Sequence, residues 1–420
     1  MSVTQSGARP SDLLPASILG LLGSRGPMTR AELAAALRVS AATITQASKD
    51  LMARGMVLEL GQIASAGGRP ARPLSLVGSS GRIVGVKVTA THLAVVAAGL
   101  DGTVWQAESV PFEAARPDAL DQAARSLGAI LDGIDQPVLG VGVGIPGAVD
   151  SLESGVADSP TIGLHNAQVG AALRQRLGLP VLVENDVNAL TVAEQVYGVG
   201  RTYSTYLVIT IGRGIGCGIV IDGQVYRGAG GGAGEIGHIP MVEDGADCPL
   251  GHAGCLESLI GSSGLMRQAR QLGLGQVVDG SASFDREREA IRRLAEVARR
   301  DPAVAEGLFG WAGGWLGGAV AGAVNLLNPE VVVVLGEGSE QWDLWQPGFE
   351  AAFRAKLMAS RRSIPYLVEA WDEDKWALGA AALVIATSFD RDGATGYQGE
   401  LVRERLSHAA SGRRRPQARV

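Results

Sequence analysis

Short apolar runs and longer amphipathic stretches alternate along most of this chain, and together they predict a mixed α/β protein. The runs at 138–144, 207–211 and 331–335 have the length and composition of strands buried in a sheet. The stretch at 117–132 has the length of a helix. The stretch at 311–327 is also a helix candidate, and its richness in apolar residues and glycine means that it must be buried.

The first 78 residues show a different pattern, in which three helices precede two short strands. Thr29 and Glu32 form the capping-box pattern that begins a helix, and Ser40 is the residue type expected just before another. Helices are expected at 12–24, from about 30 to 37 and from 41 to about 54, and strands near 56–60 and 73–76. This order predicts a winged helix-turn-helix domain at residues 12–78.

The third predicted helix carries polar side chains on the face opposite its apolar positions. Short polar side chains near the start of such a helix can reach base edges in the major groove of DNA. Arginines on a Gly-rich wing can enter the minor groove or bind phosphates. The candidate DNA-binding residues are Thr43, Thr45, Gln46 and Lys49 of the helix, with Arg69 and Arg72 of the wing. The alternative is a helical protein-interaction module whose polar face is only solvated.

The distribution of charge favours DNA binding by the N-terminal module. Residues 1–75 contain eight Lys or Arg against four Asp or Glu, whereas the rest of the chain has 29 against 39. A basic module on an acidic body suggests that only the module meets nucleic acid. No apolar run is long enough to cross a bilayer, and the N-terminus lacks a signal peptide's apolar core. Three cysteines make no disulfide framework, so we expect a cytoplasmic protein.

Candidate chemistry concentrates in residues 207–257. Glycine occupies every second position from Gly212 to Gly218, a pattern that allows a tight turn and the close approach of a ligand. A second strand is expected at 219–225, before a glycine cluster. Carboxylates suit the hydroxyls of a sugar, and His with Cys suits zinc. The side chains that follow the cluster are Glu235, His238, Cys248, Cys255 and Glu257.

This stretch resembles the signature of the ROK family of repressors, open reading frames and kinases. The signature runs from a Gly-rich strand turn through Glu-x-Gly-His to a Cys-x-Cys-Gly-x-x-Gly-Cys-x-Glu loop. Leu250 takes the place of one family cysteine. The resemblance extends from about residue 12 to about residue 388. The matching residues are Glu235, Gly237, His238, Cys248, Gly251, Gly254, Cys255 and Glu257.

The resemblance implies an actin-like, ribonuclease-H-like domain of two duplicated α/β lobes behind the winged helix-turn-helix. The first lobe would span residues 82–200, completed by a C-terminal helix at 376–388. The second lobe would span residues 201–375 and contain the cysteine loop. Residues 1–11 are expected to be disordered and residues 391–420 to form a flexible tail, since polar chain ends are usually poorly ordered.

A polar turn follows the short apolar strand at 180–183, and such turns are where open α/β sheets bind ligands. By resemblance, Asn185 and Asp186 in this turn are the family's sugar-binding pair. Asp186 stands where the family's kinases keep their catalytic base. The alternatives are ordinary turn chemistry for these two residues and a solvated surface charge for Glu235. The other sugar-binding residues that the resemblance implies are Gly147, Glu235, His238 and Glu257.

The chain departs from the family's kinases where those enzymes bind nucleotide. Lys87 and Thr89–Ala90 replace the aspartate and the two glycines of the first phosphate turn. Arg213 replaces the threonine of the second turn, and Glu337 adds a carboxylate beside the phosphates. Phosphoryl transfer depends on positioning and charge neutralisation, so we expect no catalytic residue and only a vestigial base at Asp186. The alternative is an ATP-dependent ROK sugar kinase.

The resemblance also implies a structural zinc site. His238, Cys248 and Cys255 match three of the family's four zinc ligands, and zinc in such sites takes four. Leu250 cannot serve as a ligand, whereas His252 is two residues away and has a suitable nitrogen. The fourth ligand is therefore His252 or water. The alternative is a pair of reduced thiols without metal.

These features together predict a sugar-responsive, DNA-binding transcriptional regulator of carbohydrate metabolism genes, most simply a repressor. Its partners would be operator DNA and a monosaccharide or small oligosaccharide effector. Pairing of DNA half-sites implies a homodimer or homotetramer. A third alternative is a DNA-bound scaffold that no longer senses sugar.

Overall fold

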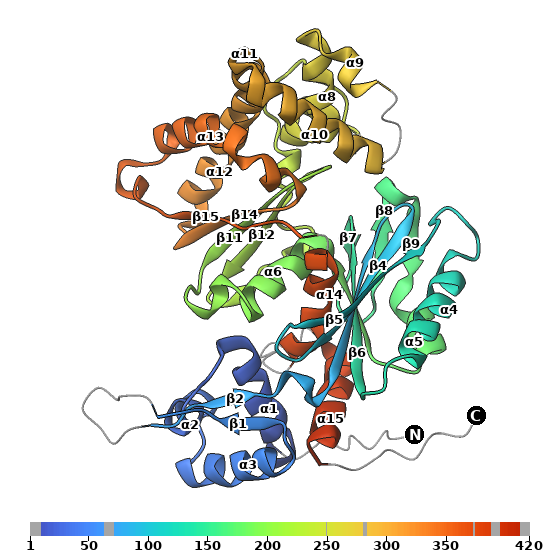
Figure 1. The fold of residues 1–420 in the computed structure, drawn as a ribbon, viewed down its shortest axis with the longest axis vertical. Helices are drawn as coiled ribbons and strands as arrows, with labels where there is room; N and C mark the ends of the chain where they lie inside the picture. The colour runs from blue at the N-terminus through green and yellow to red at the C-terminus, as the bar shows by residue number, and fades with distance from the viewer. Residues whose placement is uncertain are drawn as a thin grey trace. The chain divides into compact units, whose positions relative to one another are not determined.

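The computed structural model describes residues 10–62, 71–248, 250–279, 284–372, 374–387 and 395–411. The chain divides into two compact units (Figure 1). The first unit combines residues 1–202 with 373–420, and the second unit is residues 203–372.

The first unit begins with the predicted order of helix, helix, helix and two-stranded wing. The elements are α1 (Pro10–Arg25), α2 (Arg30–Leu37), α3 (Ala41–Ala53), β1 (Val57–Glu59) and β2 (Leu74–Leu76). The Thr29–Glu32 capping box is confirmed, because the Thr29 hydroxyl accepts the Glu32 N–H at 3.2 Å and the Glu32 carboxylate accepts the Thr29 N–H at 2.7 Å. Ser40 caps α3 through the Thr43 N–H at 3.1 Å. These caps fix where α2 and α3 begin.

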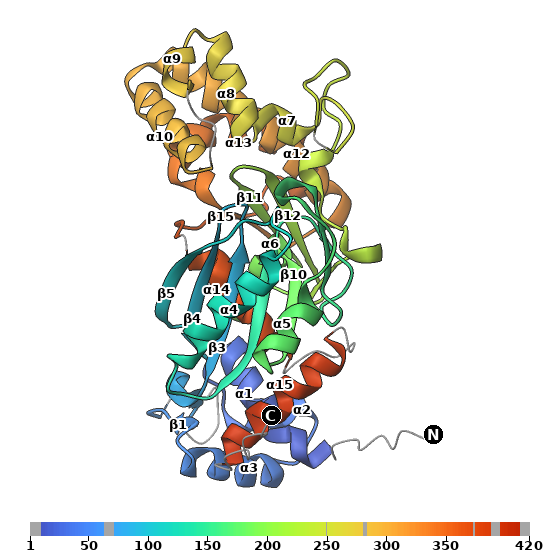
Figure 2. The same ribbon diagram turned by 90° about the vertical axis from the view of Figure 1, so that its right-hand side faces the viewer.

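The first lobe is built on a five-stranded sheet in the order β10-β6-β3-β4-β5. In this sheet β10, β6 and β3 run parallel, and β4 is antiparallel to both β3 and β5. Alternate residues of β3 face opposite sides, so Val84 and Val86 pack toward α4 and α5, whereas Gly85 faces α14 (Figures 1 and 2). The elements are β3 (Arg82–Val88), β4 (His92–Gly99), β5 (Val104–Pro111), α4 (Ala119–Asp132), β6 (Val138–Ile145), α5 (Val169–Leu177), β10 (Val181–Asn185), α6 (Asp186–Val196) and α14 (Asp374–Ala386).

A small three-stranded sheet and short 3-10 turns complete this lobe. The sheet order is β7-β8-β9. The elements are η1 (Gly78–Ser80), β7 (Ala148–Val149), β8 (Val156–Ser159), η2 (Pro160–Ile162), β9 (Leu164–Gln168) and η3 (Val199–Arg201).

The second unit has its own five-stranded sheet, in the order β13-β12-β11-β14-β15. Its helices pack closely where glycines of α12 face α13, since a Cβ added at Gly317 would approach the backbone of Phe349 and Phe353. The strands are β11 (Tyr206–Ile211), β12 (Ile215–Ile221), β13 (Gln224–Val225), β14 (Val331–Leu335) and β15 (Tyr366–Val368). The α-helices are α7 (Leu256–Ile260), α8 (Ser262–Gln271), α9 (Gly275–Val278), α10 (Phe284–Arg300), α11 (Pro302–Val304), α12 (Trp311–Leu327) and α13 (Trp342–Lys356). The remaining segments are the 3-10 turns η4 (Ala229–Gly231), η5 (Ile236–His238), η7 (Glu337–Gln341) and η8 (Ala359–Arg361), and the π-helix η6 (Ala305–Gly310).

The prediction of a flexible tail at 391–420 is wrong for part of that segment. Residues Gly396–Ser411 form α15, which packs against α1, β6 and β10. Val402 and Leu406, one helical turn apart, are both 1% exposed, and this short apolar stripe is hidden among charged residues in the sequence. At the other end of the chain, α1 begins at Pro10, inside the segment expected to be disordered. Among the described helices, none combines the length and the apolar character needed to span a membrane.

Replacing Gly142 by alanine should destabilise the first lobe. A Cβ at this position in β6 would clash with the Ala380 carbonyl of α14, and overpacking of this kind costs about 1–3 kcal/mol. The matched control is Gly128→Ala in α4, where nothing lies within 4 Å of an added Cβ and a gain of up to ~1 kcal/mol is expected. Urea denaturation measures both, and equal midpoints for the two variants would contradict the packing described here.

Candidate functional site

Three of the predicted DNA-binding side chains lie on one exposed face of α3. Thr43, Gln46 and Lys49 are all exposed and follow one another at intervals of three residues, which places them on one side of the helix. Thr45 is half-buried, and its hydroxyl donates to the Ala41 carbonyl oxygen at 2.7 Å. The structure therefore separates Thr45 from the other three candidates.

The wing contributes one described arginine to the candidate set. Arg72 precedes β2, and its guanidinium lies 3.1 Å from the Glu59 carboxylate of β1. Arg30 of α2 binds the same carboxylate at 2.7 Å. These two hydrogen bonds, that from Arg30 first, lower the pKa of Glu59. The Arg72 side chain is 56% exposed, so it remains accessible at the edge of the wing, whereas Arg69 lies outside the described residues.

Asp186 is the first residue of α6, and its carboxylate is paired with a lysine. Its carboxylate forms an ion pair with the Lys87 ammonium from β3, and its other oxygen accepts the Val187 N–H at 2.9 Å. The same ammonium lies 4.6 Å from the centre of the Trp376 ring on α14, a cation–π contact. Only 13% of the Lys87 side chain and 12% of the Asp186 side chain are exposed. A fixed positive charge therefore stands beside the carboxylate.

Asn185 holds the turn before α6 together. Its side-chain oxygen accepts the Asn188 N–H at 3.1 Å, and its side-chain nitrogen donates to the Gly147 carbonyl at 2.9 Å. Gly147 has a φ of 103°, and a Cβ there would lie 2.5 Å from the Asp158 carbonyl oxygen. The residue must therefore be glycine. Asn185 thus has a capping role, and its contact with Gly147 joins two of the predicted sugar-binding residues.

The second unit brings the other three predicted sugar-binding residues together. His238 Nε2 lies 3.8 Å from the Glu235 carboxylate at η5. Glu257, in the first turn of α7, accepts the Ile215 N–H at 3.0 Å, and a Cβ on Gly237 would lie 3.3 Å from the Glu257 Cβ. The three side chains are therefore grouped around the Ile236–Gly237 turn. Glu235 is the most accessible, with 56% of its side chain exposed.

A His and Cys cluster lies directly beside this group. Its four donor atoms all lie within 4.8 Å of one another. The His238 Nδ1 is 3.4 Å from the Cys248 sulfur, so one ring nitrogen faces the cluster while the other faces Glu235. His252 Nε2 is buried, and it neither accepts nor donates a hydrogen bond within the described part of the chain. The members are His238, Cys248, His252 and Cys255.

Local backbone contacts explain why the cluster forms. The Cys248 N–H donates to the His252 carbonyl at 2.6 Å, and this tight turn directs both side chains inward. Cys255 caps α7, its sulfur accepting the Ser258 N–H at 3.4 Å. Leu250, at the family's cysteine position, is 50% exposed and cannot contribute a ligand. Two nitrogens and two sulfurs are a donor set that zinc binds in tetrahedral geometry.

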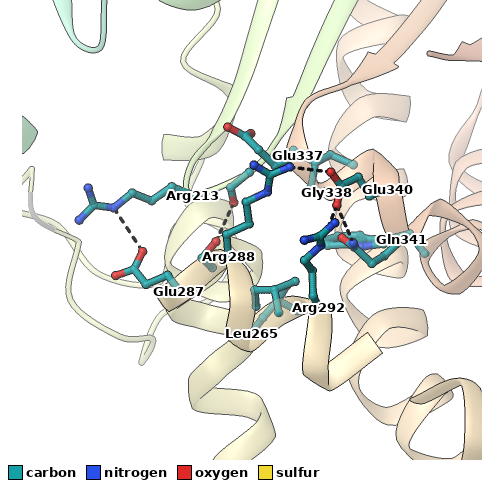
Figure 3. A pocket seen from close by; sticks show the side chains of 14 residues that line it. Arg213, Leu265, Glu287, Arg288, Arg292, Glu337, Gly338, Glu340 and Gln341 are labelled. Atoms are coloured by element: carbon teal, nitrogen blue, oxygen red, sulfur yellow. Dashed lines mark hydrogen bonds and ion pairs between the residues drawn. The ribbon is translucent and has the colours of Figure 1, made fainter. Parts of the chain in front are cut away.

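A charged pocket of the second unit lies where the sequence departs from the kinase pattern (Figure 3). Glu337 lies so close to Gly212 that a Cβ on that glycine would clash with its carboxylate. Arg213 lies 3.5 Å from Glu287, whose pKa is raised by burial. Among the other lining residues, Arg288 and Arg292 share the Glu340 carboxylate at 2.7 and 3.4 Å. The arginines are thus matched by carboxylates of the same chain.

Sequence reasoning missed part of this arrangement. The sequence identifies Lys87 only as a replacement for the aspartate of the first phosphate turn, and its pairing with Asp186 spans 99 positions. The sequence assigns Trp376 to a helix and indicates no partner for it. Neither contact has a local sequence signal, because the first depends on the pairing of β3, β6 and β10 and the second on the packing of α14 against β3. The expected strand at 219–225 begins earlier, at Ile215, and α7 and α8 meet at Gly261 as two separate helices.

A two-lobed α/β body with a His and Cys loop, preceded by a winged helix-turn-helix arrangement, defines the class of this protein. A model of the ROK family matches residues 83–387, and the chain belongs to this family. The DNA-binding transcriptional dual regulator NagC of Escherichia coli K12 is 27% identical over 376 residues, which are 88% of this chain and 91% of that protein. The xylose repressor of Caldicellulosiruptor bescii is 25% identical over 371 residues, 86% of this chain and 92% of that protein.

Solved structures agree with this placement. The crystal structure of a ROK family transcriptional regulator, a homologue of the E. coli MLC protein, matches with a TM-score of 0.74 and 24% identity. That match covers 94% of this chain and 99% of the other. A ROK family glucokinase from Streptomyces griseus, solved with glucose and AMPPNP, matches with a TM-score of 0.62 and 29% identity. That match covers 72% of this chain and 99% of the glucokinase chain.

Replacing Lys87 by methionine should destabilise the protein, because the Asp186 carboxylate would remain nearly buried without its cation. Removing one partner of a fully buried pair costs about 3–5 kcal/mol, and the residual exposure of this pair reduces the expected loss to about 1–3 kcal/mol. The double variant with Asp186→Asn should recover much of it, since no charge is then left uncompensated. Urea denaturation measures both, and a double variant no more stable than Lys87→Met alone would count against the pair.

Proposed function

We propose that this chain is a sugar-responsive, DNA-binding transcriptional repressor of genes for carbohydrate use. The observation that carries the proposal is the combination of a winged module with a ROK domain in which Asp186 is paired to Lys87. The relatives named N-acetylglucosamine repressor and xylose repressor cover most of this chain, which supports the same reading. The effector is thus a monosaccharide or small oligosaccharide.

In this proposal, α3 enters the major groove of operator DNA. Gln46 and Lys49 are exposed on the face that would meet base edges and phosphates, with Thr43 nearer the start of the helix. Arg72 would bind the backbone or the minor groove beside the wing. Two recognition helices are needed for a symmetric operator, so the working form would be a homodimer or homotetramer in the cytoplasm.

In the first unit, Asp186 and the turn at Asn185 would offer hydrogen-bond acceptors to the effector sugar. In the second unit, the group at Glu235, His238 and Glu257 would offer acceptors and donors. Hydrogen bonds to charged groups contribute about 1.5–3 kcal/mol each, and a missing hydroxyl leaves a buried partner unpaired. Asp186 is paired with Lys87, and its carboxylate would act as a hydrogen-bond acceptor for the sugar.

The rival function is an ATP-dependent sugar kinase, which shares the fold of the ROK domain. A kinase needs a carboxylate for magnesium at the position of Lys87 and open backbone N–H groups at the phosphate turns. Here a lysine occupies the first position, and Glu337 lies against Gly212 in the second. These features support a protein without catalytic residues, in which Asp186 is a remnant of the base.

The His and Cys cluster would hold a structural zinc ion. The fit rests on the donor set and on the buried, unpartnered Nε2 of His252, which zinc would satisfy. His238 would bind the metal through Nδ1 and offer Nε2 to the bound sugar. Zinc would therefore fix the geometry of the effector site without acting on the sugar itself.

The test of the repressor function uses DNA duplexes selected from a random library by the full-length protein. Xylose, glucose and N-acetylglucosamine are then titrated into the complex, and fluorescence anisotropy reports the affinity. At least one sugar should change operator affinity about 5–150-fold, the range of a 1–3 kcal/mol coupling. A protein that selects no sequence, or whose DNA affinity no sugar changes, would contradict the proposal.

Substitutions on α3 make the same test specific. Lys49→Ala should weaken binding to all duplexes and lower the salt slope by about one, whereas Gln46→Ala should lose about 1–3 kcal/mol of discrimination at one base pair. The matched control is Arg125→Ala on α4, which removes an arginine whose side chain is 58% exposed in the first lobe. Equal losses for Lys49→Ala and Arg125→Ala would argue against α3 as the DNA-reading helix.

The zinc proposal predicts about one zinc ion per chain in the purified protein, measured by mass spectrometry of the metal. His252→Ala should weaken zinc binding at least tenfold, since a tetrahedral site loses one of its four protein ligands. His165→Ala is the control, because that histidine belongs to the first unit and its side chain is 71% exposed. If His252→Ala retains zinc as tightly as the control, water or another group is the fourth ligand.

A further inference from the structure

Helix α6 joins the proposed effector turn to the winged module. Asn185 and Asp186 lie at its N-terminal end, and Val196 is its last residue. The chain then continues into η3, which ends at Arg201. All of these residues belong to the first unit, together with the winged module itself. One helix therefore lies between the two sites that a sugar-responsive regulator must connect.

The helix is buried and closely packed along most of its length. Nine of its eleven residues are buried, and it is about 16 Å long at 1.5 Å per residue. Its backbone packs against α14 at close range, since a Cβ on Gly379 would lie 2.9 Å from the Leu190 Cα. Close-packed helices shift as units and do not deform gradually. A displacement at Asp186 would therefore reach the far end of α6.

Arg201 fastens that far end to the winged module. Its Nε donates to the Val196 carbonyl at 3.2 Å, and its Nη2 donates to the Gly23 carbonyl of α1 at 3.0 Å. Gly23 is in the last turn of α1, where carbonyl groups lack partners within the helix. A guanidinium is well placed there, because the C-terminal end of a helix carries partial negative charge. A single side chain thus bonds the ends of both helices.

A second contact lies beside the first. Tyr197 follows α6, and a Cβ on Gly102 would lie 3.1 Å from its ring. The turn that contains Gly102 also binds the connector between the wing and the lobe, because the Leu100 N–H donates to the Gly78 carbonyl at 3.1 Å. The end of α6 therefore contacts both α1 and the turn that holds this connector.

We propose that α6 transmits effector binding to the DNA-binding module and that Arg201 is the residue that couples them. This inference rests on the proposed function, because it needs a sugar at the turn of Asn185 and Asp186. A sugar that binds better when α6 is displaced would move Arg201 and, through the Gly23 carbonyl, α1. The sugar's differential affinity for the two arrangements sets how far the equilibrium can shift.

The experiment compares full-length wild-type protein with Arg201→Gln by hydrogen–deuterium exchange, with and without xylose or N-acetylglucosamine. In wild type, the sugar should change exchange at residues 181–190 and also at 18–25. In Arg201→Gln, the change at 181–190 should persist while that at 18–25 is lost. The effect of sugar on DNA affinity should likewise fall below twofold. Arg201→Lys, which keeps the charge, should retain part of the coupling.

The control variant is Arg174→Gln. Arg174 also donates to backbone carbonyls, those of Glu153, Ser154 and Val181, but none of these belongs to the winged module. It should keep both exchange changes. The inference is overturned if Arg201→Gln keeps the change at 18–25, or if wild type changes only at 181–190. If neither sugar changes 181–190 in wild type, sugar binding at this turn fails, and the inference fails with it.

Discussion

The ion pair between Lys87 and Asp186 is the interaction on which the rest of the first lobe's site depends. It places a permanent cation at the end of β3, next to the first residue of α6, in a setting where little of either side chain is exposed. Trp376 of α14 covers the ammonium. The counter-charge of this carboxylate is therefore supplied by the chain itself.

The second unit shows the same preference for internal charge partners. Glu337 lies against Gly212, and the arginines of the neighbouring pocket are matched by Glu287 and Glu340. Glycines at this turn make room for carboxylates of the chain itself. Gly214 does so for Glu257, whose oxygen would lie 2.5 Å from a Cβ there. A nucleotide phosphate entering this pocket would find its arginines already paired with carboxylates of the chain, whereas the acceptors grouped near the Ile236–Gly237 turn suit uncharged hydroxyls.

Local patterns in the sequence predict much of the fold. The capping residues Thr29 and Ser40 marked where α2 and α3 begin, and apolar runs marked β11 and β14. The His and Cys loop was also predictable, since its members are close in sequence. Long-range contacts were not. Gly261 separates α7 from α8, and the Ser262 N–H beside it donates to the Arg213 carbonyl, a partner that no pattern around residue 261 indicates.

The link between α6 and α1 belongs to the same class, because Arg201 and Gly23 are 178 positions apart. Such contacts arise only when the lobe and the winged module pack together. They are also the contacts through which an effector could act on DNA binding. The sequence therefore predicts much of the fold, whereas the proposed mechanism depends on contacts that only the structure reveals.

The most direct test of the central claim is to incubate the purified protein with ATP, magnesium and a panel of monosaccharides, and to follow both sugar binding by calorimetry and sugar phosphate by mass spectrometry. The account predicts that a sugar binds with the same affinity whether or not ATP and magnesium are present, and that no sugar phosphate forms. Accumulation of sugar phosphate would contradict it.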